Sequence, residues 1–166
     1  MCSAEVTMAD FSVFQRSTLL ETSPSEAYSF HEDPRNITKI SPSSLRVKSV
    51  DCTVPAQVGN EFRLCISQFG LPLEWIGFWV EVVPCSSLVD GAKKSPFKHW
   101  RHHHLFHAEG NKTLMTDRVE YALPGGVLGL LLDLTVMRLV FTAMFLARHR
   151  ATRKFFSKAK LPKSGN

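Results

Sequence analysis

Four side chains that could do chemistry alternate along one predicted strand, residues 99–108. Successive side chains of a strand point to opposite faces, so Trp100, His102, His104 and Phe106 share one face. This face carries the aromatic residues, and we therefore expect it to point inward. Two histidines at this spacing can chelate zinc if a third ligand approaches, and a strand histidine can also act as a general base near neutral pH.

The groups available to assist these histidines are His31 and Asp117. Either could supply the third zinc ligand, and Asp117 could orient His102 or His104 as an acid or base. His31 fits either the mouth of a cavity or a surface position at a helix C-terminus, where the helix dipole favours it. Partly buried imidazoles bonded to neighbouring polar groups are the simplest interpretation. We therefore predict no metal site and no assigned catalytic residue, with His102, His104 and Asp117 as weak catalytic candidates.

Several common catalytic motifs are absent from the sequence. It contains no Walker-type loop, no Gly-x-Gly-x-x-Gly, no Gly-x-Ser-x-Gly and no His-Glu-x-x-His. These absences argue against nucleotide-driven chemistry and the common hydrolase mechanisms. No cofactor is predicted.

A strand and two short helices are predicted to precede the rest of the fold. Residues 11–22 read as a strand that ends at Ser23-Pro24-Ser25-Glu26. This sequence combines a serine N-cap, a proline at the first helical position and a glutamate three residues after the cap. It predicts a helix to about Glu32, and Asp33-Pro34 then predicts a second short helix to about Ile40.

Six further strands are predicted between residues 45 and 123. The predicted strands are 45–52, 60–69, 73–83, 86–90, 99–108 and 113–123, with turns at 58–60, 70–72, 90–91 and 109–111. Short strands joined by tight turns indicate an antiparallel meander, because parallel pairs need crossover helices. Trp75 and Trp79 share one face of their strand, but both faces are apolar, so the pattern does not say which face points inward.

One long helix is predicted for the last third of the chain. Residues 127–147 are almost wholly apolar, and residues 148–163 are strongly basic. A helical projection places a polar stripe opposite an apolar face that should meet the sheet. The polar stripe is Thr135, Arg138, Thr142, His149 and Arg153, and the apolar face is Met137, Val140, Phe141 and Met144. Asp133 is predicted to be an N-cap where the helix restarts, the alternative being a polar group that lines a pocket.

The length of 166 residues and the net charge of +5 fit one domain with a basic end. We predict a leader over 1–10, a single domain over 11–158 and a basic tail over 159–166. From Leu134 onward there are eight Lys or Arg residues and no acidic residue, so this segment could contact an acidic membrane surface. No nucleic-acid partner is predicted.

The four cysteines and the apolar helix give information on the cellular location of the protein and on membrane insertion. The cysteines form no Cys-x-x-Cys pair, and residues 1–10 lack the pattern of a secretory signal, so we predict a cytoplasmic protein. Residues 127–147 are long enough to span a bilayer. Asp133 and Arg138 lie within them, however, at a cost of about 2.5–3.5 kcal/mol each near the bilayer centre. We therefore predict no membrane span.

The order of these elements, with five short motifs, resembles the START-type helix-grip fold and in particular the SRPBCC superfamily. The motifs are FHEDP at 30–34, GLPLEW at 70–75, PFKHWRHHHLF at 96–106, DRVEYALP at 117–124 and MFLARHR at 144–150. The resemblance covers about residues 11–156 and is closest to poorly characterised bacterial members. It implies an α+β fold in which a seven-stranded curved antiparallel sheet, two short helices and a long C-terminal helix enclose a cavity. The superfamily includes polyketide cyclases, dehydrases and lipid carriers, so no single activity is implied.

These observations favour a binding domain over an enzyme, and we predict that it holds a hydrophobic small molecule or lipid between the sheet and the C-terminal helix. The predicted ligand-binding residues are His31, Trp75, Trp100, His102, His104, Phe106, Met137, Phe141 and Met144. One alternative is a cyclase or dehydratase that uses the cavity histidines. The other is a peripheral membrane or partner-binding module that uses the basic C-terminal segment.

Overall fold

A computed structural model describes residues 11–68, 70–126, 129 and 132–159. The strands are β1 Ser12–Leu20, β2 Leu45–Cys52, β3 Glu61–Gln68, β4 Leu71–Val83, β5 Ser87–Lys94, β6 His99–Glu109 and β7 Lys112–Ala122. The α-helices are α1 Pro24–Glu32, α2 Ile37–Ile40 and α4 Arg138–Ala159. The predicted leader and most of the basic tail lie outside the described residues.

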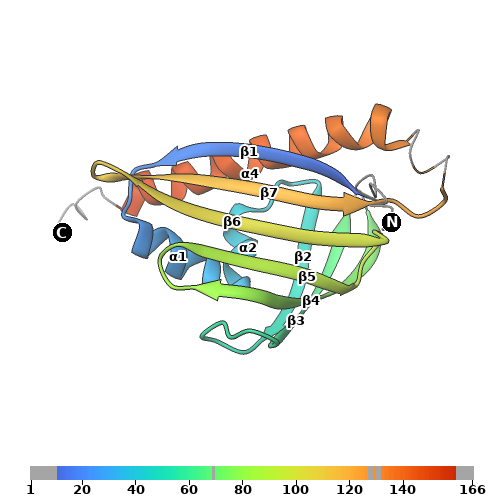
Figure 1. Ribbon diagram of the computed structural model, residues 1–166, viewed down its shortest axis with the longest axis horizontal. Coiled ribbons are helices and arrows are strands. Elements are labelled where there is room, and N and C mark those ends of the chain that lie inside the picture. Colours follow the sequence, from blue (N-terminus) through green and yellow to red (C-terminus); the bar gives the residue numbers. More distant parts are fainter. Residues whose placement is uncertain (1–10, 69, 127–128, 130–131, 160–166) are drawn as a thin grey trace, which may run out of the picture.

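The seven strands form one antiparallel sheet in the order β1-β7-β6-β5-β4-β3-β2. Figure 1 shows the sheet bending around its helices, with α4 running lengthwise along β1 and β7 and with α1 and α2 near one end. The long helix and the two short ones lie against the concave side, where the main apolar core is found. The predicted α+β helix-grip fold and its antiparallel meander are therefore confirmed.

The first helix starts and ends where the sequence predicts. Ser23 Oγ accepts a hydrogen bond from the Glu26 backbone N–H, and the Glu26 carboxylate accepts one from the Ser23 N–H. These reciprocal bonds satisfy two backbone donors that a helix N-terminus would otherwise leave free. A 3₁₀ turn, Pro34–Asn36, then leads into α2, so the second predicted helix is partly 3₁₀.

The turn predicted at Asp90-Gly91 is wrong. Both residues lie inside β5, and the reversal comes later, between the end of β5 at Lys94 and the start of β6 at His99. Gly91 is required for another reason, because a Cβ at this position would lie 2.8 Å from the Phe78 ring. The glycine permits close packing within the sheet. As a consequence Asp90 is a buried strand residue.

The C-terminal helix has an irregular start, but it does not break at Asp133, because Leu132 and Arg138 both have right-handed helical backbone angles. A π-helical turn, Asp133–Met137, precedes α4. As predicted, the apolar face meets the sheet, since Phe141 is 2% exposed and its ring centroid lies 4.6 Å from that of Tyr121.

The placement of His149 on a polar stripe is wrong. In the second half of α4 the buried stripe is Phe145, His149, Thr152 and Phe156. The helix crosses a curved sheet, so the side of the helix that is buried changes along its length. Near the start of α4 this side includes Phe141, and further on it includes His149. A carboxylate of β7 accepts the His149 hydrogen bond, which makes burial of this imidazole tolerable.

Asp133 fulfils neither role proposed from the sequence. Its carboxylate caps no helix N-terminus and does not line the cavity described below; it accepts hydrogen bonds from Tyr121 Oη and Ser12 Oγ. Asp133 is 6% exposed, so these two hydroxyl donors replace the water it loses. The contact ties the start of the C-terminal helix to β1 and β7.

Both tyrosines of the chain should resist ionisation in the folded protein. Burial and the nearby Glu32 carboxylate raise the pKa of Tyr28 to about 12. Burial and the hydrogen bond to Asp133 raise the pKa of Tyr121 as well. Titration by ultraviolet absorbance should therefore show little tyrosinate at about pH 11 while the fold persists, and both residues ionised once denaturant unfolds the chain.

The sign of the associated stability change follows from the raised pKa of Tyr28. Its contribution is complete below the unfolded value of 10.0 and is lost as pH rises through about 12. Tyr28→Phe should remove one of the two late transitions. A folded protein whose tyrosines ionise near pH 10, as confirmed by circular dichroism, would contradict this assignment.

Two further findings concern the described residues. No helix among them has both the length and the apolar composition needed to cross a bilayer. Cys52, Cys65 and Cys85 are free thiols.

Candidate functional site

A cavity of about 350 Å³ lies between the sheet and the helices α2 and α4. Alternate residues of β3 form one wall, and α2 and α4 supply the opposite side. The main apolar lining residues are Phe62, Leu64, Ile66, Ile37, Ile40, Val140 and Met144. The polar lining includes His31, Asp90, His102 and Arg148. An apolar chamber with a few convergent polar groups is the usual form of a small-molecule site.

Seven of the nine residues predicted to bind ligand line this cavity. They are His31, Trp75, Trp100, His102, Met137, Phe141 and Met144. The other two lie behind the lining. Phe106 is 3% exposed and packs edge-on against Tyr28, and His104 is 5% exposed beside Asp117.

Trp75 resolves the orientation of β4. Its ring lies edge-on to that of Trp100, with centroids 4.9 Å apart, and both rings face the cavity. Trp79 lies on the same face of β4 as Trp75 and Gly77. It is 4% exposed and belongs to the core. The face of β4 that carries the two tryptophans is therefore the inward one.

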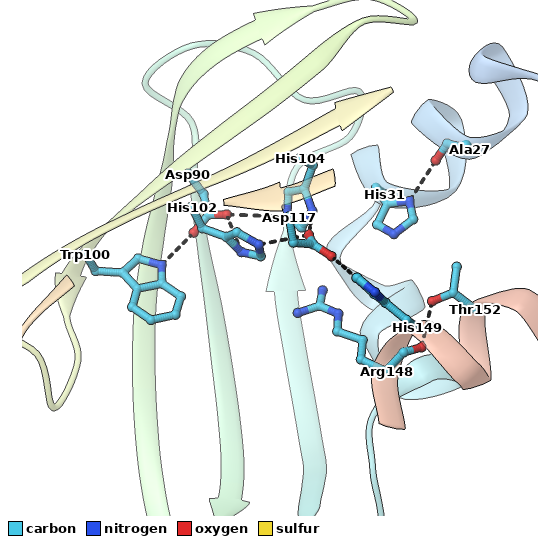
Figure 2. Close-up of polar contacts among 10 residues, drawn as sticks. All are labelled: Ala27, His31, Asp90, Trp100, His102, His104, Asp117, Arg148, His149 and Thr152. Carbon is cyan, nitrogen blue, oxygen red and sulfur yellow. Dashed lines mark hydrogen bonds and ion pairs between the residues drawn. The ribbon is translucent and has the colours of Figure 1, made fainter. Parts of the chain in front are cut away.

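Three imidazoles converge on the carboxylate of Asp117, which is 1% exposed (Figure 2). His102 Nε2 donates to Oδ1 at 2.9 Å, and His149 Nε2 donates to Oδ2 at 2.6 Å. His104 Nδ1 lies 2.7 Å from Oδ1 as an ion-pair contact. Because β6, β7 and α4 all contribute, this group forms only when the helix docks on the sheet.

The electrostatics of this group follow from burial and from these contacts. Burial opposes ionisation of Asp117, but the contacts with His102, His104 and His149 hold its pKa well below the usual range. Burial lowers the pKa of His102 to about 4. Burial acts on His104 in the same direction, but its contacts with Asp117 and Asp90 outweigh it and raise the pKa. At neutral pH, Asp117 is therefore ionised and His102 is neutral.

Asp90, like His149 and Arg148, is a site residue that the sequence prediction missed. Its Oδ1 accepts a hydrogen bond from Trp100 Nε1 at 3.1 Å. Its Oδ2 lies 3.6 Å from His102 Nδ1 and 3.7 Å from His104 Nε2. Asp90 of β5 pairs directly with His102 of β6. Extending the predicted strand 86–90 past Gly91 would therefore have placed Asp90 beside the histidines.

His31 lies inside the protein, not on its surface, and is 8% exposed. Its Nδ1 donates to the Ala27 carbonyl at 2.8 Å. Within the described residues, its Nε2 is buried without a hydrogen-bond partner. Burial lowers the pKa of His31 to about 3, so Nε2 carries a free lone pair at neutral pH.

Most basic residues of α4 are exposed, but two of them make contacts within the protein. Arg148 lines the cavity, and Arg153 donates to Thr18 Oγ1 at 2.8 Å. Residues 160–166 lie outside the described part of the chain. Contact of this segment with an acidic membrane remains a prediction.

Comparisons with known proteins agree with this architecture. The family model for polyketide cyclase/dehydrase and lipid transport matches residues 20–145. No match was found among curated protein sequences.

Solved structures share the fold at low sequence identity. A protein from Thermus thermophilus, TTHA0849, is 15% identical with a TM-score of 0.72, over 90% of this chain and 99% of its own. The Zhui aromatase/cyclase from a Streptomyces species is 11% identical with a TM-score of 0.70, over 94% and 99%. A START superfamily protein from Mycobacterium smegmatis is 12% identical with a TM-score of 0.62, over 89% and 99%.

Proposed function

The chain belongs to the polyketide cyclase/dehydrase and lipid transport family, and we propose that it binds a hydrophobic small molecule or lipid in the cavity between the sheet and α4. The observation that carries this proposal is the chamber itself. It is apolar along β3, α2 and α4, and polar where His31, Asp90, His102 and Arg148 gather. Affinity would come mainly from apolar burial, at about 25 cal/mol per Å².

The polar lining suggests what the ligand carries. The free Nε2 of His31 is an acceptor, and the guanidinium of Arg148 is a permanent donor. A ligand with an apolar body and an oxygen-bearing end, such as a hydroxyl or carboxylate group, matches this arrangement. The volume of about 350 Å³ lies near the small end of the range for ligand sites.

A large side chain placed inside the chamber should weaken the binding of a hydrophobic probe while the protein stays folded. Val140 lines the cavity, whereas its neighbour Leu139 is 72% exposed on the same helix. Val140→Trp should therefore reduce the affinity for a fluorescent fatty-acid or naphthalene probe at least tenfold by occupying its space. The affinity is measured by fluorescence titration.

Leu139→Trp is the matched control, because it adds the same side chain outside the cavity. It should leave probe affinity within about twofold of the original protein, since surface substitutions rarely disturb the interior. Equal affinities in the two folded variants, or no probe binding by the original protein, would reject the proposed site.

A second function is favoured by the contact between His102 and Asp117. His102 lines the cavity and donates to a buried ionised carboxylate, an arrangement that holds an imidazole in one orientation and tautomer. This supports a cyclase- or dehydratase-type enzyme in which His102 exchanges a proton with a bound substrate. Ligand binding is the primary proposal, because it rests on the chamber as a whole and not on one imidazole.

A further inference from the structure

We propose that Asp90, His102 and His104 bind a divalent transition-metal ion, specifically zinc, at the polar side of the cavity. This inference goes beyond ligand binding and concerns atoms that the ligand proposal does not require. It also differs from the sequence prediction, which assigned no metal and named His31 or Asp117 as the possible third ligand. The structure brings Asp90 to that position instead.

The three candidate ligand atoms lie close to the spacing that zinc needs. Asp90 Oδ2 is 3.6 Å from His102 Nδ1 and 3.7 Å from His104 Nε2, and all three atoms lie within 4.8 Å of one another. Zinc–nitrogen and zinc–oxygen bonds of about 2.0–2.1 Å put tetrahedral ligands about 3.3 Å apart. The two distances from Asp90 exceed this spacing by only a few tenths of an ångström, and rotation of the two imidazoles would complete the approach.

The atoms around the three ligands already make the contacts expected of a second coordination shell. Asp117 Oδ1 lies 2.9 Å from His102 Nε2 and 2.7 Å from His104 Nδ1. Each contact engages the ring nitrogen that does not face Asp90. A carboxylate on the far nitrogen of a histidine is the usual support for a metal ligand, because it fixes the ring and raises its basicity. Trp100 Nε1 likewise holds Asp90 Oδ1 and leaves Oδ2 for the ion.

Charge and access also favour a cation here. Asp90 and Asp117 are 7% and 1% exposed, and within the described residues neither forms an ion pair with a lysine or arginine. A divalent ion balances these two buried carboxylates. Asp90 and His102 line the cavity, so a fourth coordination position would open toward it and could take an oxygen of water or of a ligand.

The test uses the full chain, stripped with EDTA and exchanged into buffer, and then titrated with Zn²⁺ by isothermal calorimetry. We expect one ion per chain at micromolar or lower dissociation constant, confirmed by elemental analysis. Asp90→Asn and His104→Gln should each weaken binding at least tenfold. His103→Gln should not, because this neighbouring histidine points to the opposite face, beside Glu120.

Equal Zn²⁺ affinity in Asp90→Asn, His104→Gln and the original protein would overturn the site, because it would indicate adventitious binding by other histidines. Absence of Zn²⁺ binding would overturn it as well.

A second measurement covers the case in which these variants fail to fold. Paramagnetic Co²⁺ should bind the unaltered protein and quench the fluorescence of Trp100, whose indole donates to Asp90. Quenching should fall in Trp100→Phe, with the remainder due to Trp75, whose ring lies 4.9 Å from that of Trp100, and quenching that is unchanged in Trp100→Phe would reject the site. Probe binding by the EDTA-treated protein tests the ligand cavity separately, so failure of one proposal is distinguishable from failure of the other.

Discussion

Replacing Asp117 with alanine should lower the free energy of unfolding by about 3–5 kcal/mol, in the range for removing one partner of a buried ionic group. The carboxylate is 1% exposed and accepts hydrogen bonds from His102 and His149, on β6 and α4. Bonds to a charged acceptor contribute about 1.5–3 kcal/mol each, and their loss leaves buried N–H donors without acceptors. The measurement is urea denaturation in the presence of EDTA, so that no metal contributes.

Asp117→Asn should be milder, at about 1–2 kcal/mol, because the amide oxygen still accepts one hydrogen bond. The amide nitrogen can face His149 if that ring changes tautomer, since His149 Nδ1 has no partner within the described residues. The matched control is Asp51→Ala on β2, where an exposed aspartate is removed and the change should stay within about 0.5 kcal/mol. Equal losses for Asp117→Ala and Asp51→Ala would show that the three imidazoles do not depend on this carboxylate.

Most of the fold could be predicted because its signals are local. The capping sequence 23–26 fixed the start of α1, and alternation placed Trp100, His102, His104 and Phe106 on one inward face of β6. Turn sequences separated most strands, and the meander then follows because tight turns join neighbours. The Asp90-Gly91 pair shows the limit of such signals. A glycine chosen for turn formation and a glycine chosen for close packing against Phe78 look identical in one sequence.

The site depends on contacts that no local pattern reports. Asp117 and His149 are separated by 32 positions, and they meet only because α4 crosses the sheet at β7. A helical projection averages burial over the whole helix, whereas the buried side of α4 shifts along its length. The projection therefore placed His149 on the polar stripe, away from the sheet. Asp133 was misassigned for a related reason, since its donors, Ser12 and Tyr121, come together only through the pairing of β1 with β7.

Phe141→Ala should destabilise the protein by about 3–5 kcal/mol, the range for truncating a buried phenylalanine. The ring is 2% exposed, and its centroid lies 4.6 Å from that of Tyr121 and 5.5 Å from that of Phe14. These contacts hold the first half of α4 against β1 and β7. The lost burial is only partly recoverable, because the neighbouring aromatic rings are too rigid to collapse into the space. Thermal and urea denaturation measure the effect.

Leu139→Ala separates this packing from any general effect of shortening a side chain on α4. Leu139 is 72% exposed and precedes Phe141 by two residues, so its truncation removes almost no buried surface and should change stability by less than about 0.5 kcal/mol. Phe141 also lines the cavity, so the space it vacates joins the existing chamber and is open to a ligand. A saturating hydrophobic probe should therefore restore part of the lost stability in Phe141→Ala, because a ligand that binds only the folded state stabilises it in proportion to its occupancy. If Phe141→Ala is no less stable than Leu139→Ala, the helix is not held to the sheet by this ring, and the wall of the proposed cavity is not where the structure places it.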